Sequence, residues 1–445
     1  MIVQSRMVWF ILCPMFKLKI PVFIKVLLLF ALPLLACAVI KNSTPAPTPV
    51  PTPNTNALVL TEAVKNTRIM LTRIARKTLN APTATKTPRP VTPVTAQPKK
   101  KTPTPTPTTQ PSNIDEIIIH APALANNLLG ETPERGLRVY LPESYTQADK
   151  HYPVVYALLD FGLETGEFSI SSEELQRDVD FGLTKEMLIV VISGTNSLGG
   201  SFYVNSPVSG NWDDFIAGDV VSYIDSHYRT IPRPASRGIS GFAVGGFGAL
   251  NVAMRHPDVF GAVYSVSPTL FDKDSLPLSP MFAAQTTIDS VLNLLLREEP
   301  MSINDGTTDM QHAGDAQFSI AYGTTFAPNT VKPPYMDYPY YRQNGRIFRD
   351  EAIWQRWESG FGNNLDRIQQ YKENLLKLTS LTLACGENAP YSWIPEGCKA
   401  FAAQLTANGI PNQLASFPKD HVPAFGQLIR EFTLPFFSEK LNFTP

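Results

Sequence analysis

The amino-acid sequence predicts a large α/β domain with a mostly parallel sheet over residues 114–445. From residue 114 onward, short β-rich apolar runs alternate with stretches of helical periodicity. Apolar strands that alternate with helices are typical of a parallel sheet covered on both faces. About 330 residues suffice for one such domain, and we see no internal repeat.

The elements follow one another in a regular order. Strands are expected at Leu137–Leu141, Val154–Leu159, Leu188–Ile192, Gly238–Ser240, Ala262–Val266, Leu381–Cys385 and Gln413–Phe417. Helices are expected near 172–184, 212–227, 244–255, 284–297, 364–377, 395–408 and 423–440. A long insertion at about 269–362 separates the strand at Ala262–Val266 from the strand at Leu381–Cys385.

Residues 1–36 have the features of a signal peptide. Val26 to Ile40 form an unbroken apolar run, and Lys17, Lys19 and Lys25 precede it. Its 15 residues are few for a membrane span but suit the apolar region of a signal peptide.

The end of that run, Leu34-Leu35-Ala36-Cys37, resembles the lipobox of bacterial lipoproteins. The resemblance implies cleavage before Cys37 and a lipid on its thiol, so the expected location is extracytoplasmic and membrane-anchored. An uncleaved signal anchor, helped by the apolar stretch from Val8 to Phe16, and simple secretion remain the alternatives. All three place the rest of the chain outside the cytoplasm.

Residues 37–113 read as a Pro/Thr-rich basic linker, largely disordered. Pro and Thr alternate through Thr44–Pro53 and Thr102–Thr109, which favours polyproline II and a stiff spacer. Between these runs, segment 57–80 has apolar residues at helical spacing interleaved with Lys and Arg. It reads either as a basic amphipathic helix on an anionic membrane or as a partly helical linker with no docking site.

Charge and cysteine content narrow the possible partners. Residues 114–445 carry a net charge of −15, which argues against nucleic acid because phosphates would be repelled. Outside the cell, Cys385 and Cys398 form either one disulfide or two unpaired buried thiols. Four scattered cysteines have no metal-ligand spacing, so we expect neither a metal nor a cofactor.

The segment from Arg237 to Leu250 carries the strongest signal. A strand runs into Gly241-Phe242-Ala243-Val244-Gly245 and then directly into a helix of small residues. This resembles the nucleophile elbow of α/β-hydrolases, in which a serine stands at the centre of a strained turn.

Further stretches resemble one branch of these enzymes, the esterase D and S-formylglutathione hydrolase family that also includes mycolyltransferases. They are Val139–Tyr145, Tyr152–Tyr156, Asn211–Ile216, Tyr223–Arg229 and His256–Phe260, and the resemblance covers roughly residues 135–440. It implies an α/β-hydrolase fold and ester or acyl chemistry.

The catalytic positions depart from the family pattern. The nucleophile position is Ala243, whose methyl group cannot attack a carbonyl. Ala389 stands where the triad acid is expected, with Glu387 as a shifted alternative, whereas His421 matches the general base. Ser240 would serve as nucleophile only in a rebuilt elbow.

The oxyanion hole implied by the family is half intact. Its donors would be the backbone N–H groups of Val244 and Phe161. Asp160 stands where the family usually has histidine, and its carboxylate would oppose an oxyanion unless turned away. We expect Asp160 either to contact a ligand or to be a solvated residue at the strand end.

The resemblance implies that the insertion at about 269–362 forms a substrate cap. Its aromatic residues are consistent with a cleft for acyl chains or sugar rings. Tyr203 and Trp212 are further ligand-binding candidates. The leading hypothesis is a surface-anchored esterase-family pseudoenzyme that binds an acyl or glycan ligand. The alternatives are an active ester hydrolase or acyltransferase with a displaced nucleophile, and a structural surface protein without a ligand.

Overall fold

The computed structural model describes residues 113–147, 149–168, 170–296, 314–387, 389, 391–417 and 425–445. The expectations for the leader, Cys37, the linker, segment 57–80 and His421 lie outside these residues. Among the described helices, none is both long and apolar enough to cross a bilayer.

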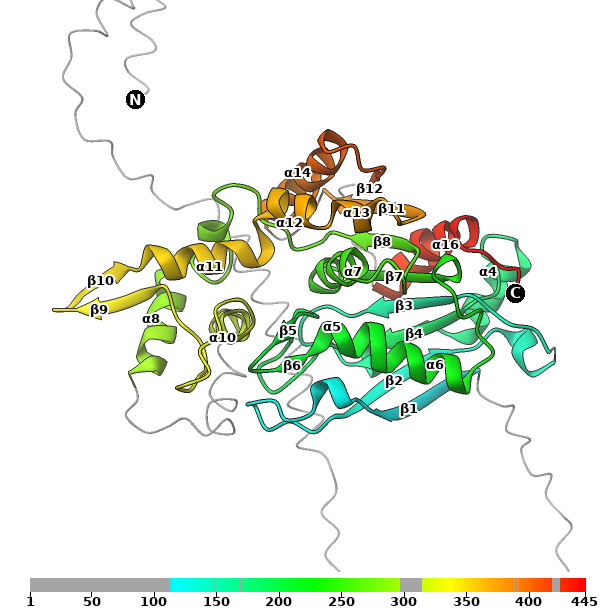
Figure 1. The fold of residues 1–445 in the computed structure, drawn as a ribbon, viewed down its shortest axis with the longest axis horizontal. Helices are drawn as coiled ribbons and strands as arrows, with labels where there is room; N and C mark the ends of the chain where they lie inside the picture. Colours follow the sequence, from blue (N-terminus) through cyan, green and yellow to red (C-terminus); the bar gives the residue numbers. More distant parts are fainter. Residues whose placement is uncertain are drawn as a thin grey trace, which may run out of the picture. The chain divides into compact units, whose positions relative to one another are not determined.

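Eight strands of the described part form one sheet in the order β1-β2-β4-β3-β7-β8-β11-β12 (Figure 1). Their bounds are Ile114–His120 (β1), Glu134–Tyr140 (β2), Val154–Leu158 (β3), Leu188–Ile192 (β4), Arg237–Phe242 (β7), Ala262–Val266 (β8), Ser380–Gly386 (β11) and Gln413–Phe417 (β12). β2 runs antiparallel to both β1 and β4, and every other neighbouring pair is parallel. This confirms the α/β-hydrolase fold.

The neighbouring strands β3 and β4 are apolar at every position because helices cover both faces of the sheet. On β3, Val154, Tyr156 and Leu158 belong to one buried cluster, whereas Val155 and Ala157 belong to another. Successive side chains of a strand point to opposite faces, so these clusters are the cores above and below the sheet.

Helices from distant parts of the chain cover the two faces (Figure 1). The β3 face with Tyr156 packs against α5 (Trp212–Asp214), α6 (Val221–His227), α7 (Val244–Arg255) and α14 (Trp393–Ala407). A π-helix, Phe215–Val220, joins α5 to α6. The opposite face packs against α4 (Ser172–Asp180), α15 (Phe425–Leu428) and α16 (Leu434–Lys440).

All seven expected strands are present, with ends shifted by at most a few residues. β1 was not predicted; it is an edge strand that pairs only with β2 among the described strands. The first helix was expected to reach residue 184, whereas α4 ends at Asp180. Gly182 follows with φ = 69°, a left-handed conformation that stops a helix.

The cap lies between β8 and α12 (Asn364–Gln370), which α13 (Lys372–Leu375) follows. Its described elements are α8 (Gln285–Leu295), α10 (Asp315–Phe326), the hairpin β9 (Tyr340–Gln343) and β10 (Arg346–Arg349), and α11 (Glu351–Phe361). Tyr322 and Trp357 are completely buried, and Trp354 and Tyr338 nearly so. These aromatic residues therefore form the core of the cap and do not line a cleft.

Candidate functional site

The elbow keeps its strained backbone although its serine is missing. Ala243, between β7 and α7, has φ = 50° and ψ = −109°, a conformation that non-glycine residues rarely adopt. A Cβ added to Gly241 would lie 2.2 Å from the carbonyl oxygen of Gly245. One added to Gly245 would lie 2.2 Å from the Leu158 oxygen. The two glycines thus allow β7, α7 and β3 to approach closely around the turn.

Neighbouring strands hold the backbone of Ala243 in place. Its N–H donates to the Val266 carbonyl at 3.0 Å, and its carbonyl accepts the Thr269 N–H at 3.2 Å. The turn is therefore anchored to the end of β8, and only the half-buried methyl group projects from it. The turn therefore presents a methyl group where the family pattern implies a serine hydroxyl.

Ser240 cannot substitute for the missing serine in this arrangement. It is completely buried within β7, and its hydroxyl donates to the Tyr264 carbonyl at 2.6 Å. A hydroxyl in that position faces a neighbouring strand and has no access to a substrate.

Asp160 bonds to both of the expected oxyanion donors. Its Oδ1 atom accepts the Phe161 N–H at 2.8 Å and the Val244 N–H at 3.1 Å. These are the two groups that the family pattern implied as oxyanion donors, and they converge on one carboxylate oxygen. The expectation of a solvated residue at the strand end was wrong, because Asp160 is half-buried and folded back over the elbow.

Electrostatics explain why the carboxylate lies there. The N–H groups at the first turn of α7 favour negative charge, and the Val244 N–H belongs to that turn. Burial nevertheless raises the pKa of Asp160 to about 6, because the two backbone hydrogen bonds only partly offset the loss of water. The carboxylate therefore carries charge at neutral pH but loses it in mild acid.

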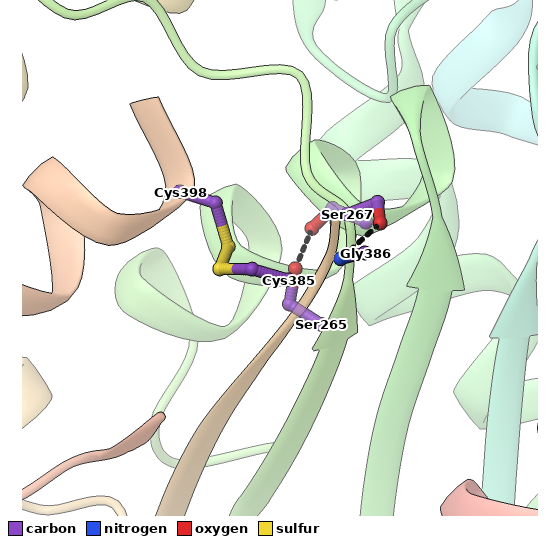
Figure 2. Close-up of a disulfide and its surroundings, with 6 residues drawn as sticks. Ser265, Ser267, Cys385, Gly386 and Cys398 are labelled. Carbon is purple, nitrogen blue, oxygen red and sulfur yellow. Dashed lines mark hydrogen bonds between the residues drawn. A yellow bond between two sulfur atoms is a disulfide. The ribbon is translucent and has the colours of Figure 1, made fainter. Parts of the chain in front are cut away.

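The family pattern places the acid loop directly after β11, at Glu387 and Ala389. The Ser267 hydroxyl accepts the Gly386 N–H at 3.1 Å and ties the ends of β8 and β11 together (Figure 2). Glu387 is exposed, and Ala389 is half-buried against the core. Neither residue provides a buried acid.

A disulfide between Cys385 and Cys398 confirms the pairing that was one of two alternatives. It joins the end of β11 to α14, and its Cα atoms lie 6.0 Å apart (Figure 2). Both cysteines are buried, so the bond fixes the strand from which the acid loop departs.

Tyr203 and Trp212 are core residues, and the structure contradicts their assignment to ligand binding. The Tyr203 hydroxyl donates to the Leu159 carbonyl at 2.7 Å, and its ring lies where a Cβ on Gly248 would fall. Trp212 is completely buried and donates from Nε1 to the Ser209 carbonyl at 2.9 Å. Both side chains pack α7 and α5 onto the sheet.

The Phe161 side chain covers a glycine pair beside the site. A Cβ on Gly200 would lie 2.5 Å from its ring, and the Phe318 ring of α10 lies 4.9 Å away between centroids. Phe161 is half-buried, so part of it remains open to solvent next to Asp160. This contact joins the oxyanion turn to the cap.

The sequence analysis assigned no role to a charged cluster at the far end of α7. Asp213 is completely buried and forms ion pairs with Arg255 and with His256, whose Nε2 lies 3.1 Å from its Oδ1. The hydrogen bond with Asp213 raises the pKa of His256. Asp213, Asp214 and His256 are close enough to ligate an ion. Arg255 already balances the buried charge of Asp213, so we interpret the cluster as a structural contact between α5 and the end of α7.

A cavity of about 410 Å³ lies at the amino ends of β3 and β4. It is lined by residues that precede β3 and β4, among them Lys150, His151 and Lys185. Neither Ala243 nor Asp160 borders it, so it is separate from the elbow.

Known proteins resemble this chain over different lengths. Two curated esterases from strains of Mycobacterium tuberculosis are 30% identical over 137 residues, which is 30% of this chain. The match spans only 28% of the length of those relatives.

Among solved structures, a ferulic acid esterase matches with a TM-score of 0.46 and 17% identity. The match covers 74% of this chain and 98% of that protein. An S-formylglutathione hydrolase from Agrobacterium tumefaciens matches with a TM-score of 0.41 and 15% identity, over 74% and 95% of the two chains.

A family model described as "Putative esterase" matches residues 132–368, which include β2, the oxyanion turn, the elbow and the cap. That is more than half of the sequence. The chain therefore belongs to the Putative esterase family.

Proposed function

We propose that this esterase-family protein does not hydrolyse esters and instead binds a small acyl or glycan ligand in the former active site. The observation that carries the proposal is the hydrogen-bonding of Asp160 to both oxyanion donors, beside an alanine at the nucleophile position. A site with no nucleophile and no free oxyanion donors lacks the two principal parts of acyl-transfer chemistry.

The magnitudes favour loss of activity. In serine hydrolases, loss of the nucleophile costs about 10⁶ in turnover, and residual catalysis of about 10³ to 10⁴ over water comes from the oxyanion hole and binding. Here Asp160 also fills that hole, so even the residual route is closed.

An active hydrolase with a displaced nucleophile is the competing function, and the family membership is the reason to test it. Ser240 is the sequence candidate, but its buried hydroxyl donates to the Tyr264 carbonyl. A structural surface protein without any ligand is the third alternative, which ligand-binding measurements separate from our proposal.

We further propose that the domain is held outside the cytoplasm by lipid on Cys37. The sequence Leu34-Leu35-Ala36-Cys37, the Pro/Thr-rich spacer and the disulfide support this location. Metabolic labelling with an alkyne fatty acid should mark the full chain and should fail to mark a Cys37→Ser variant. Equal labelling of both would refute the anchor.

Activity-based labelling tests the loss of catalysis. A fluorophosphonate reagent should leave the wild-type protein unlabelled, while an S-formylglutathione hydrolase run in parallel reacts. Covalent labelling that a Ser240→Ala variant abolishes would refute the proposal and establish the displaced nucleophile.

A further inference from the structure

The oxyanion donors of this site are already satisfied. Phe161 and Val244 direct their N–H groups at Asp160 Oδ1, so neither remains for a ligand. A carbonyl or carboxylate group from a ligand would have to displace the carboxylate to reach them. The chain therefore carries its own substitute for the oxyanion.

The second oxygen of Asp160 has no partner among the described residues. The hydrogen bonds of this side chain in the described part are the two at Oδ1. A half-buried carboxylate with one free oxygen is a strong hydrogen-bond acceptor. The polarity of the site is thus the reverse of that in a serine hydrolase, which offers two donors.

The neighbouring cap carries a second carboxyl group. Asp315 begins α10, one helical turn before Phe318, whose ring contacts Phe161. Burial raises the pKa of Asp315, and burial, with a smaller contribution from the charge of Asp315, raises the pKa of Tyr391 beyond the acid loop.

Aromatic surface lies at Phe161, the residue that follows Asp160. Phe161 and Phe318 are both half-buried, with centroids 4.9 Å apart. Aromatic rings beside a carboxylate favour cations, because the ring face is negative and excludes water. The apolar part of a ligand would lie against the same rings.

From these contacts we infer that Asp160 determines the specificity of the former active site. Its carboxylate keeps carbonyl and oxyanion groups away from the Phe161 and Val244 N–H groups and selects a ligand that presents a protonated amine to its second oxygen. This inference rests on the proposed ligand-binding function and narrows it. The amine belongs either to an amino sugar or to an alkyl chain, and matched compounds distinguish these sources.

Calorimetric titration tests the inference with two pairs of compounds: glucosamine against glucuronate, and octylamine against octanoate. Wild-type protein should bind the amine of at least one pair and neither acid. Asp160→Asn keeps an amide oxygen for both N–H groups but removes the charge, so amine affinity should fall about tenfold. Asp160→Gly frees the donors, so affinity for the matching acid should rise about tenfold.

Circular dichroism and melting curves establish that both Asp160 variants fold. Asp315→Asn is a further variant that removes a different negative charge. Wild-type binding of either acid as tightly as Asp160→Gly binds it would overturn the inference and leave the proposed function standing. If Asp160→Asn binds the amine as tightly as the wild type does, the inference is likewise overturned and the proposed function still stands. If none of the four compounds binds any variant, the inference and the proposed function both fail.

Discussion

Asp160 Oδ1 lies 3.1 Å from the backbone nitrogen of Val244, the first residue of the helix that follows the elbow. In a serine hydrolase that N–H stabilises the negative oxygen of the tetrahedral intermediate. Here a side-chain carboxylate oxygen accepts the same N–H group. That N–H is therefore already hydrogen-bonded in the structure without a ligand.

Restoring the catalytic residues alone should not restore activity. We expect Ala243→Ser with Ala389→Asp to remain nearly inactive on p-nitrophenyl acetate, because Asp160 still fills the oxyanion hole. Adding Asp160→Gly should raise turnover at least about 10²-fold, the usual contribution of an oxyanion donor. Steady-state kinetics of the double and triple variants provides the comparison.

The matched control for that series is a triple variant with Asp160→Asn, whose side chain still occupies the hole. It should stay as slow as the double variant. Equal rates for the glycine and asparagine triples would mean that Asp160 does not block the site.

Asp160 should make stability depend on pH in mild acid. Its pKa is raised from 3.8 to about 6, so the folded state holds this proton more tightly than the unfolded chain. Its contribution to stability is complete below about pH 4 and is lost as pH rises through 6, a loss on the order of 2 kcal/mol. Asp160→Asn should lack this loss.

Urea unfolding of wild type and Asp160→Asn at pH 4, 5, 6 and 7.5 measures the effect. As pH rises, the free energy of unfolding of the wild type should fall relative to that of the variant. The variant should be the more stable protein at pH 7.5. A constant difference between them over this range would contradict the raised pKa.

Close packing at the elbow should make Gly245 intolerant of a methyl group. In Gly245→Ala the new Cβ would meet the Leu158 and Leu159 carbonyl oxygens at 2.2 and 2.7 Å. Because backbone cannot move aside cheaply, we expect a loss of about 3 kcal/mol. Thermal and urea unfolding would measure it.

Gly218→Ala is the control, since a Cβ there meets no atom within 4 Å and the residue lies in a helical segment. It should be neutral or stabilising by up to about 1 kcal/mol. Equal stability of the two variants would argue against the close approach of α7 and β3.

The disulfide should contribute measurably to stability. It closes a loop of 13 residues between buried positions, which restricts the unfolded chain. Replacing Cys385 and Cys398 by Ser together should lower the free energy of unfolding by about 3 kcal/mol. The wild-type protein reduced under denaturing conditions should lose a similar amount, and an unchanged midpoint in both would exclude a stabilising bond.

The local pattern of the sequence was sufficient for much of the fold. Apolar runs such as Leu188–Ile192 predicted buried parallel strands because both faces of such strands need cover. The elbow could also be recognised from the sequence, because Gly241 and Gly245 flank the turn at the spacing of the motif. β1 was missed, because an edge strand with one exposed face lacks a continuous apolar run.

The sequence by itself determined that Ala243 stands at the centre of an elbow-like motif, and it offered Tyr203 and Trp212 as ligand-binding candidates. Only the tertiary structure decided that both aromatic side chains are buried packing residues. It also decided the role of Asp160, whose partner Val244 is 84 residues away along the chain. A side chain's hydrogen bonds depend on which distant backbone groups the sheet brings beside it, and residue type does not specify them.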